Sequence, residues 1–201
     1  MIPCETPTDA ASGKWKDPLC SCLKYGCCHP LFLHACCCQQ ILLAQTMTRL
    51  RLTACGKSSG TTGKWRYTFR IMLVLTIIYY TLKILLPDFI LEERGLLMPS
   101  GKYASILVVL NHLLSVSFFC YCCYGITLTR RFIRERDGIP AACPLEDACV
   151  SLWCSCCAIS QCALQTANYE FLRAECCSNT GIVAMSLDQQ TNEYSSHIEL
   201  V

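Results

Sequence analysis

Clustered cysteines are the residues of this sequence whose type and spacing could do chemistry. Residues 27–38 read CCHPLFLHACCC, and residues 153–162 read WCSCCAISQC. One group contains Cys20, Cys22, Cys27, Cys28, Cys36, Cys37 and Cys38, and the other contains Cys143, Cys149, Cys154, Cys156, Cys157 and Cys162. Thiols this dense can form disulfides, bind soft metal ions, carry acyl chains or pack as small apolar side chains.

Metal binding is one of the uses that the spacing leaves open. A structural zinc site usually takes four ligands arranged as two close pairs. Cys154 and Cys157 have C-x-x-C spacing, but the first group offers C-x-C and C-C pairs instead, so the pattern is not that of a zinc finger. Thiolates from both groups, with Cys36 and Cys38 joining Cys154 and Cys157, could still hold zinc or another soft ion. Packing and acylation remain the alternatives.

Catalytic motifs are not visible in the chain. The segment GKSS at Gly56 resembles the end of a phosphate-binding loop, but the earlier glycine of that motif is replaced by Arg51. Glu146 and Asp147 form no arrangement with a nucleophile and a base. We therefore expect a protein that is not an enzyme. The net charge of +2 gives no reason to expect a nucleic-acid partner.

Two apolar blocks predict a membrane protein. The first, residues 68–90, carries no charge over residues 71–82; Arg70 and Lys83 are expected to extend toward the headgroups, and Pro87 and Asp88 to end the segment. The second block, residues 103–128, has no formal charge. About 20 apolar residues span a bilayer core as a helix, although the first block could also be a buried core helix. The bilayer is therefore an expected partner.

The two blocks predict an antiparallel hairpin because the connection between them is short. Basic residues without acidic ones precede the first block, and more follow the second: Arg49, Arg51, Lys57, Lys64, Arg66 and Arg70, then Arg130, Arg131, Arg134 and Arg136. Positive charge at these ends places both termini in the cytoplasm. The N-terminal residues also lack the apolar core of a signal peptide. Stable disulfides are then not expected, because the cytosol is reducing.

Polar side chains within the second block are candidate functional residues. Asn111 and His112 are expected near the bilayer midplane, where such groups are costly unless they face a partner helix or water. Asn111, Ser115 and Cys122 share one helical face, which could line a pathway or hydrogen-bond between helices. Two spans cannot enclose a pore, so conduction would require a homo-oligomer. Near the end of this block, Cys120, Cys122 and Cys123 are candidate acylation sites.

The predicted fold class is mainly α: an integral membrane helical hairpin flanked by two cysteine-rich, partly helical modules. Leu43, Met47 and Leu50 recur at helical spacing in the first module, and a helix is expected from Asp147 or Ala148 in the second. The expected segments are a flexible N-terminus (1–14), module one (15–55), a linker (56–67), the hairpin (68–128), module two (129–175) and a disordered tail (176–201).

These residues together resemble the cysteine-rich family of placenta-specific protein eight, cornifelin, and the plant cell number regulators and cadmium-resistance proteins. The family's opening is similar to Trp15, Leu19, Cys20 and Cys22 followed by the pair Cys27 and Cys28, and its C-P-C element corresponds to Cys36, Cys37 and Cys38, with Cys37 in place of proline. The later motif resembles residues 120–140 with Arg130 or Arg131, Arg134 and Ile139, followed by Asp147, Cys149, Cys154, Cys156, Cys157, Ala158 and Gln161. Cys149 is displaced by one position, and Cys162 stands where the family usually has glutamate.

The resemblance covers residues 15–55 and 118–170, and it implies a small non-enzymatic membrane protein, often of the plasma membrane. Relatives of this kind are linked to heavy-metal or calcium movement and to control of cell number. We therefore expect an oligomeric factor in divalent or heavy-metal ion transport or tolerance. The alternative is an acylated membrane scaffold or a regulator of cell number and growth.

Overall fold

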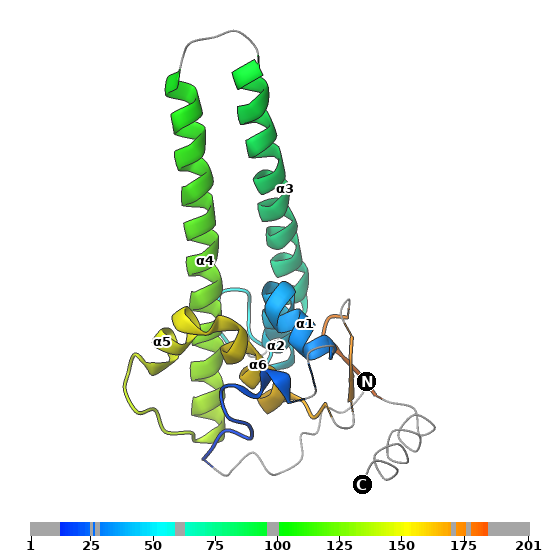
Figure 1. The fold of residues 1–201 in the computed structure, drawn as a ribbon. Coiled ribbons are helices and arrows are strands. Elements are labelled where there is room, and N and C mark those ends of the chain that lie inside the picture. Colours follow the sequence, from blue (N-terminus) through cyan, green and yellow to red (C-terminus); the bar gives the residue numbers. More distant parts are fainter. Residues whose placement is uncertain are drawn as a thin grey trace.

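The computed structural model describes residues 13–24, 26, 29–58, 63–95, 101–169, 172–175 and 178–184. Its elements are η2 (Ser21–Leu23), α1 (Pro30–Cys37), α2 (Gln39–Arg49), η4 (Lys64–Tyr67), α3 (Thr68–Gly95), α4 (Gly101–Asp137), α5 (Glu146–Trp153), α6 (Ser155–Thr166), β1 (Leu172–Ala174) and β2 (Ile182–Ala184). Helices α3 and α4 extend side by side from a group of shorter elements, which we call the head (Figure 1). The chain is mainly helical, as predicted.

Two segments are long and apolar enough to cross a membrane: Lys64–Leu85, which starts in η4 and continues in α3, and Ile106–Asp137 in α4. Helix α3 continues through Pro87 and Asp88 to Gly95, so these residues do not end the helix, although the candidate span ends just before them at Leu85. Helix α4 also extends beyond the predicted block, to Asp137. The last turns of α4 pack within the head, where Thr129 and Ile133 are fully buried.

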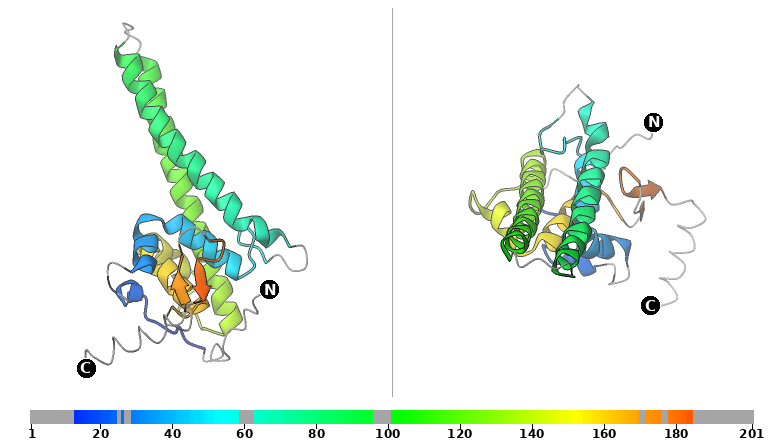
Figure 2. Two further views of the ribbon diagram at one scale, coloured as in Figure 1. Left: turned by 90° about the vertical axis from the view of Figure 1, so that its right-hand side faces the viewer. Right: turned by 90° about the horizontal axis from the view of Figure 1, so that it is seen from above.

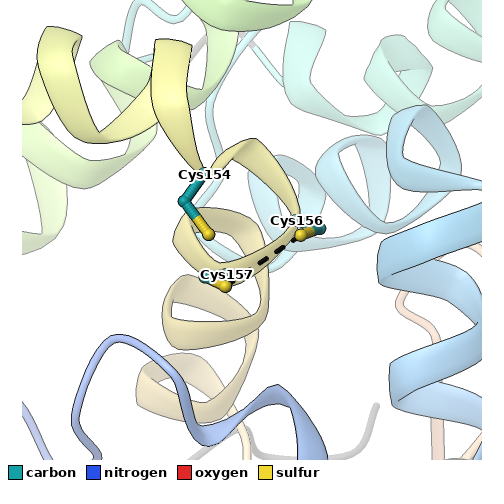
Figure 3. A group of neighbouring side chains, drawn as sticks. All are labelled: Cys154, Cys156 and Cys157. Atoms are coloured by element: carbon teal, nitrogen blue, oxygen red, sulfur yellow. Dashed lines mark hydrogen bonds between the residues drawn. The ribbon is translucent and has the colours of Figure 1, made fainter.

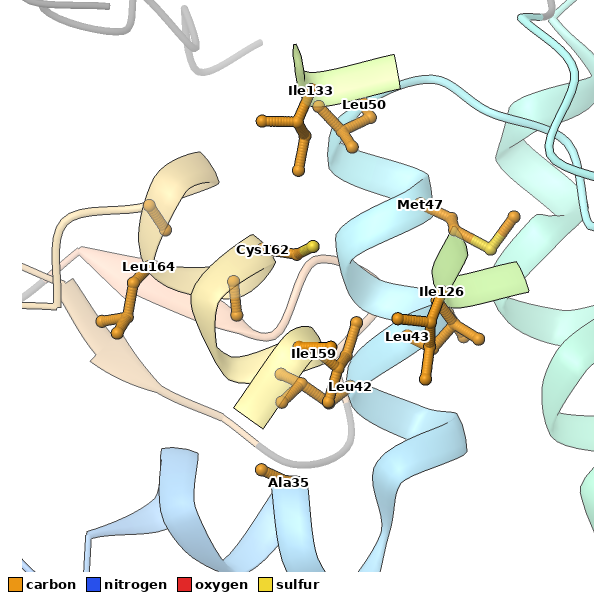
Figure 4. Packing of buried hydrophobic residues seen from close by; sticks show 14 of the residues in the cluster. Ala35, Leu42, Leu43, Met47, Leu50, Ile126, Ile133, Ile159, Cys162 and Leu164 are labelled. Atoms are coloured by element: carbon orange, nitrogen blue, oxygen red, sulfur yellow. The ribbon is translucent and has the colours of Figure 1, made fainter. Parts of the chain in front are cut away.

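The core of the head lies where α2 and α6 meet the lower part of α4 (Figure 4). Leu43 and Met47, predicted to lie on one helical face, are fully buried against Ile126, and Ile159 of α6 closes the cluster. Gly125 allows α2 and α4 to approach closely, since a Cβ atom there would lie 3.0 Å from Cδ2 of Leu43. The apolar spacing in residues 43–50 thus predicted the face of α2 that forms the core.

The head contains a structural repeat that the sequence did not reveal. Helices α1 and α2 are separated by the single residue Cys38, and α5 and α6 by the single residue Cys154. The backbone conformation is similar at both breaks, with φ −131° and ψ 44° at Cys38 and φ −143° and ψ 60° at Cys154. The helix axis bends by 117° between α5 and α6. Each module is therefore a short helix, a cysteine and a longer helix.

A two-stranded antiparallel sheet follows α6, with Leu172 opposite Ala184 (Figure 2). The Gln45 side chain of α2 donates hydrogen bonds to the carbonyl oxygens of Glu175 and Ser178, which attach this segment to the head. Strand β2 lies within the tail that we expected to be disordered, so the structure differs from that expectation at Ile182–Ala184. The rest of the predicted tail from residue 185, and residues 1–12 of the predicted flexible N-terminus, lie outside the described residues.

A buried ionic network connects the elements of the head. Arg130 of α4 is only 2% exposed; its Nε donates to Oδ1 of Asp147 at 3.1 Å and its Nη1 to Oε1 of Gln161 at 2.6 Å. Arg134, one turn later, donates to the same Asp147 oxygen at 2.9 Å. The ring of Trp15 covers both guanidinium groups, with its centroid 4.6 Å from Cζ of Arg130. The network therefore joins the N-terminal segment to α4, α5 and α6.

Removing the carboxylate from this network should strongly destabilise the head. In the variant Asp147→Asn the two buried guanidinium groups lose their shared counter-ion, and breaking a buried ion pair in this way costs about 3 to 5 kcal/mol. The measurement is denaturant unfolding in detergent, followed by the helical circular dichroism signal.

Glu135→Gln is the matched control, because Glu135 pairs with Arg131 on the same helix but both side chains are mostly exposed. Exposed pairs contribute less than about 1 kcal/mol. Equal losses of unfolding free energy in the two variants would contradict a structural role for the buried network.

Candidate metal centre

Three thiols of module two gather at the break between α5 and α6. The sulfur atoms of Cys154, Cys156 and Cys157 all lie within 4.8 Å of one another (Figure 3). Cys156 and Cys157 are in the first turn of α6, and their sulfur atoms are 4.0 Å apart. Cys154 joins them because the chain turns sharply at that residue. The three cysteines of the C-x-C-C motif therefore come together because of the bend, and not because they share one helical face.

Module one adds two further thiols to this group. The sulfur of Cys22, in η2, lies 4.0 Å from the sulfur of Cys157. Cys36, in the last turn of α1, is exposed, and Cys156 and Cys22 lie close enough to its thiol to raise its pKa. Both η2 and α1 contact α6, which explains how cysteines distant in sequence meet. We call these five residues, Cys22, Cys36, Cys154, Cys156 and Cys157, the thiol cluster.

Electrostatics within the thiol cluster favour neutral thiols when no cation is present. Burial raises the pKa of Cys157, and hydrogen bonding to Cys154 and the proximity of Cys156 raise it further. Burial also raises the pKa of Cys36, followed by the effects of Cys156 and Cys22. Adjacent thiolates repel one another, so the anionic form becomes favourable only when a positive charge lies among the sulfurs. A metal ion can supply that charge.

Two of the distances between sulfur atoms are close to those of a metal thiolate site. Four thiolates arranged tetrahedrally around zinc, each with a bond of about 2.3 Å, have sulfur atoms about 3.8 Å apart. Two of the separations in the thiol cluster, Cys22 to Cys157 and Cys156 to Cys157, are each 4.0 Å. Soft ions such as zinc, copper(I) and cadmium prefer thiolate ligands. The chemistry of these residues therefore fits zinc or another soft metal ion.

The cysteines predicted as ligands are only partly brought together. Cys154, Cys157 and Cys36 belong to the thiol cluster. Cys38 instead occupies the break before α2, and the structure does not place it among these thiols. Cys22 and Cys156, which the sequence analysis named among the clustered thiols, were not in the predicted ligand set. Both are members of C-x-C pairs, but their proximity depends on how η2, α1 and α6 pack, which spacing does not show.

A second polar centre joins the two long helices. The ammonium group of Lys83 on α3 donates to Oδ1 of Asn111 at 2.9 Å and to Oγ of Ser115 at 3.0 Å on α4. The expectation that Lys83 extends away toward headgroups is therefore wrong, because these acceptors on α4 bind it. Asn111 has the helix-joining role that was one of its two predicted alternatives. His112 lies on the exposed surface of α4 and takes no part in these hydrogen bonds.

The three candidate acylation sites on α4 differ in exposure. Cys120 is exposed, whereas Cys122 and Cys123 are only 4% and 6% exposed. The thiol of Cys123 lies 3.6 Å from the carbonyl oxygen of Ser151 on α5. Packing against the head thus leaves Cys120 as the accessible member of the three. Every cysteine that the structure describes is a free thiol.

Comparison with known proteins found no matching family model, no matching curated protein and no matching solved structure. The resemblance to the cornifelin family therefore stays a prediction from the motifs. The structure nevertheless gives the motif residues two physical roles. Trp15, Arg130, Arg134, Asp147 and Gln161 belong to the ionic network, and Cys22, Cys36, Cys154, Cys156 and Cys157 form the thiol cluster.

Metal binding at the thiol cluster should become stronger as the pH rises. The raised pKa values of Cys36 and Cys157 mean that these thiols are protonated at neutral pH, so an entering ion must displace their protons. Between about pH 6 and pH 8 the apparent affinity for cadmium should increase about tenfold per pH unit for each proton displaced. Cadmium–thiolate absorption during titration of the reduced protein measures it; an affinity independent of pH would contradict binding through these thiols.

Proposed function

We propose that the chain is a non-enzymatic integral membrane protein that binds a soft metal ion at the thiol cluster and contributes to heavy-metal tolerance or transport. The observation that carries the proposal is the meeting of thiols from both modules beside two long apolar helices. A site assembled from distant segments at sulfur separations suited to a metal ion is more specific than cysteine abundance alone.

In the proposed topology, α3 and α4 form a two-span hairpin and the head lies on one side of the bilayer. Helices α5 and α6 together are also apolar enough to count as one bent span. We assign α6 to the head because its side chains are buried there and its Gln161 and Gln165 form hydrogen bonds within it. This assignment returns the chain to the side of the membrane where it started.

We place the head in the cytoplasm, at the plasma membrane. Basic side chains at the head end of α3, Lys64, Arg66 and Arg70, agree with the excess of positive charge expected on the cytoplasmic side. The plasma membrane is the location that the family resemblance implies. A reducing compartment also suits a site that depends on free thiols.

Transport, as opposed to binding alone, would require several copies of the chain. Two helices cannot enclose a pore, and the ammonium of Lys83 occupies the contact between α3 and α4. A positive charge at that position repels cations, so a cation path between the two helices of one copy is disfavoured. We therefore propose a homo-oligomer in which any path runs between copies.

Replacing cluster thiols should abolish stoichiometric metal binding. The variant Cys22→Ser/Cys156→Ser/Cys157→Ser removes sulfur atoms from both modules with little change in volume. Mass spectrometry of the purified, reduced protein loaded with cadmium should show one bound ion in the unmodified protein and none in the variant. Cells that express the variant should lose the cadmium tolerance conferred by the unmodified chain.

Cys143→Ser/Cys149→Ser is the matched control, since both residues belong to module two but are exposed and lie outside the thiol cluster. It should retain the metal and the tolerance. Loss in the control as great as in the cluster variant would contradict a specific site. If the thiol-cluster variant loses the metal but the cells keep their cadmium tolerance, metal binding at the cluster stands and the proposed role in tolerance is excluded.

A second candidate function is an acylated membrane scaffold or regulator of cell number and growth. The exposed thiol of Cys120, on the outer surface of α4, favours it. Acyl exchange labelling should then detect an acyl group that disappears in Cys120→Ser and remains in Cys122→Ser/Cys123→Ser, because those two thiols are buried. No labelling of the unmodified protein would exclude this candidate.

A further inference from the structure

Helix α5 has the reverse of the polarity expected for a helix on the surface of a soluble head. The side chains that it buries against α4 include the polar residues Asp147 and Ser151. Its outer surface carries Leu145, Cys149, Leu152 and Trp153, all exposed, with Leu152 at 54% and Trp153 at 89%. Positions 145, 149 and 152 recur at the spacing of one helical face, and Trp153 borders it. We call these four residues the α5 stripe.

Contacts at the two ends of α5 determine its direction along α4. At its beginning, Glu146 and Asp147 pair with Arg134. At its end, the carbonyl oxygen of Ser151 accepts a hydrogen bond from the thiol of Cys123. Helix α5 therefore runs antiparallel to α4, from the charged end of α4 toward its apolar part. Trp153 lies at the apolar end of the stripe and Leu145 at the charged end.

The end of α5 lies on the apolar side of the nearest exposed charge of α4. No charged residue occurs in α4 between Ile106 and Thr129, and the first exposed charge after Cys123 is that of Arg131. Eight residues of helix separate these two positions, which corresponds to about 12 Å along the axis. The break after Trp153 is therefore level with the apolar surface of α4, not with its charged end.

On α3, the same level lies close to an exposed charge. The hydroxyl of Tyr121 on α4 contacts Sδ of Met72 on α3, only two residues from the exposed Arg70. The residues around Cys123 thus lie near the boundary between charged and apolar surface on both helices. Beside them on α4, Phe119 and Tyr124 are exposed. The apolar end of the α5 stripe is therefore level with exposed aromatic side chains of α4.

We propose that the α5 stripe inserts into the bilayer at the boundary between headgroups and acyl chains, with Trp153 as its deepest anchor. The inference rests on the proposed membrane topology but not on metal binding. Lipid is the occupant because the apolar end of the exposed stripe is level with the exposed side chains of α4 that would face lipid, and because tryptophan is favoured at that boundary. Cys154 directly follows Trp153, so the thiol cluster lies immediately beneath the membrane surface.

Depth-dependent fluorescence quenching tests this insertion in full-length protein reconstituted into phosphatidylcholine vesicles. The variant Trp15→Phe/Trp65→Phe keeps Trp153 as the single tryptophan. Its emission should be blue-shifted, and lipids brominated high on the acyl chain should quench it more than iodide does. In that background, the variant Leu145→Trp/Trp153→Phe should show the opposite preference, because position 145 lies at the charged end of the stripe.

The matched control is Phe119→Trp/Trp153→Phe in the same background, which reports on the exposed surface of α4 itself. Quenching of this control by brominated lipid, together with iodide access at Trp153, would overturn the insertion while leaving the topology intact. Protection of Trp153 from both quenchers would also overturn it, by indicating a protein partner such as a second copy. A control that brominated lipid fails to quench would overturn the proposed topology, and the insertion with it.

Discussion

The buried charge of Arg130 is the constraint on which the head depends. A guanidinium group that is almost fully removed from water must be paired and hydrogen-bonded, or the folded state is not stable. Asp147 of α5, Gln161 of α6 and the ring of Trp15 satisfy this requirement from three separate parts of the chain. By fixing α5 and α6 on α4, the same contacts determine where the break at Cys154 lies. The position of the thiol cluster is thus a consequence of the ionic network.

Helix α6 carries residues of both centres. Cys157 and Gln161 are four positions apart and so lie on the same side of the helix, one toward the sulfur atoms and the other toward Arg130. The N-terminal segment contacts this helix as well, since the side-chain amide of Gln161 donates to the carbonyl oxygen of Asp17. Ordering of the sulfur ligands and ordering of the ionic network are therefore linked through one rigid element, even though their chemistry differs.

The sequence was sufficient where local pattern decides structure. The apolar blocks predicted α3 and α4, the spacing of Leu43 and Met47 predicted the buried face of α2, and a helix was expected close to where α5 begins. It was insufficient where tertiary packing decides. Lys83 could extend outward or form hydrogen bonds with α4. The second arrangement occurs because Asn111 and Ser115 on α4 face Lys83 in the folded structure. Cys22 meets Cys157 for a similar reason: η2 packs on α6, a contact between segments that no short-range spacing encodes.

The repeated unit of short helix, cysteine and longer helix also restricts how this architecture can have arisen. Module one precedes α3, whereas module two follows α4, and both units keep the same internal order. A tandem duplication of a unit together with its long helix would give alternating order along the chain, which is not observed. If the two units share an ancestor, simple tandem copying of a bent pair with its long helix does not account for the observed order.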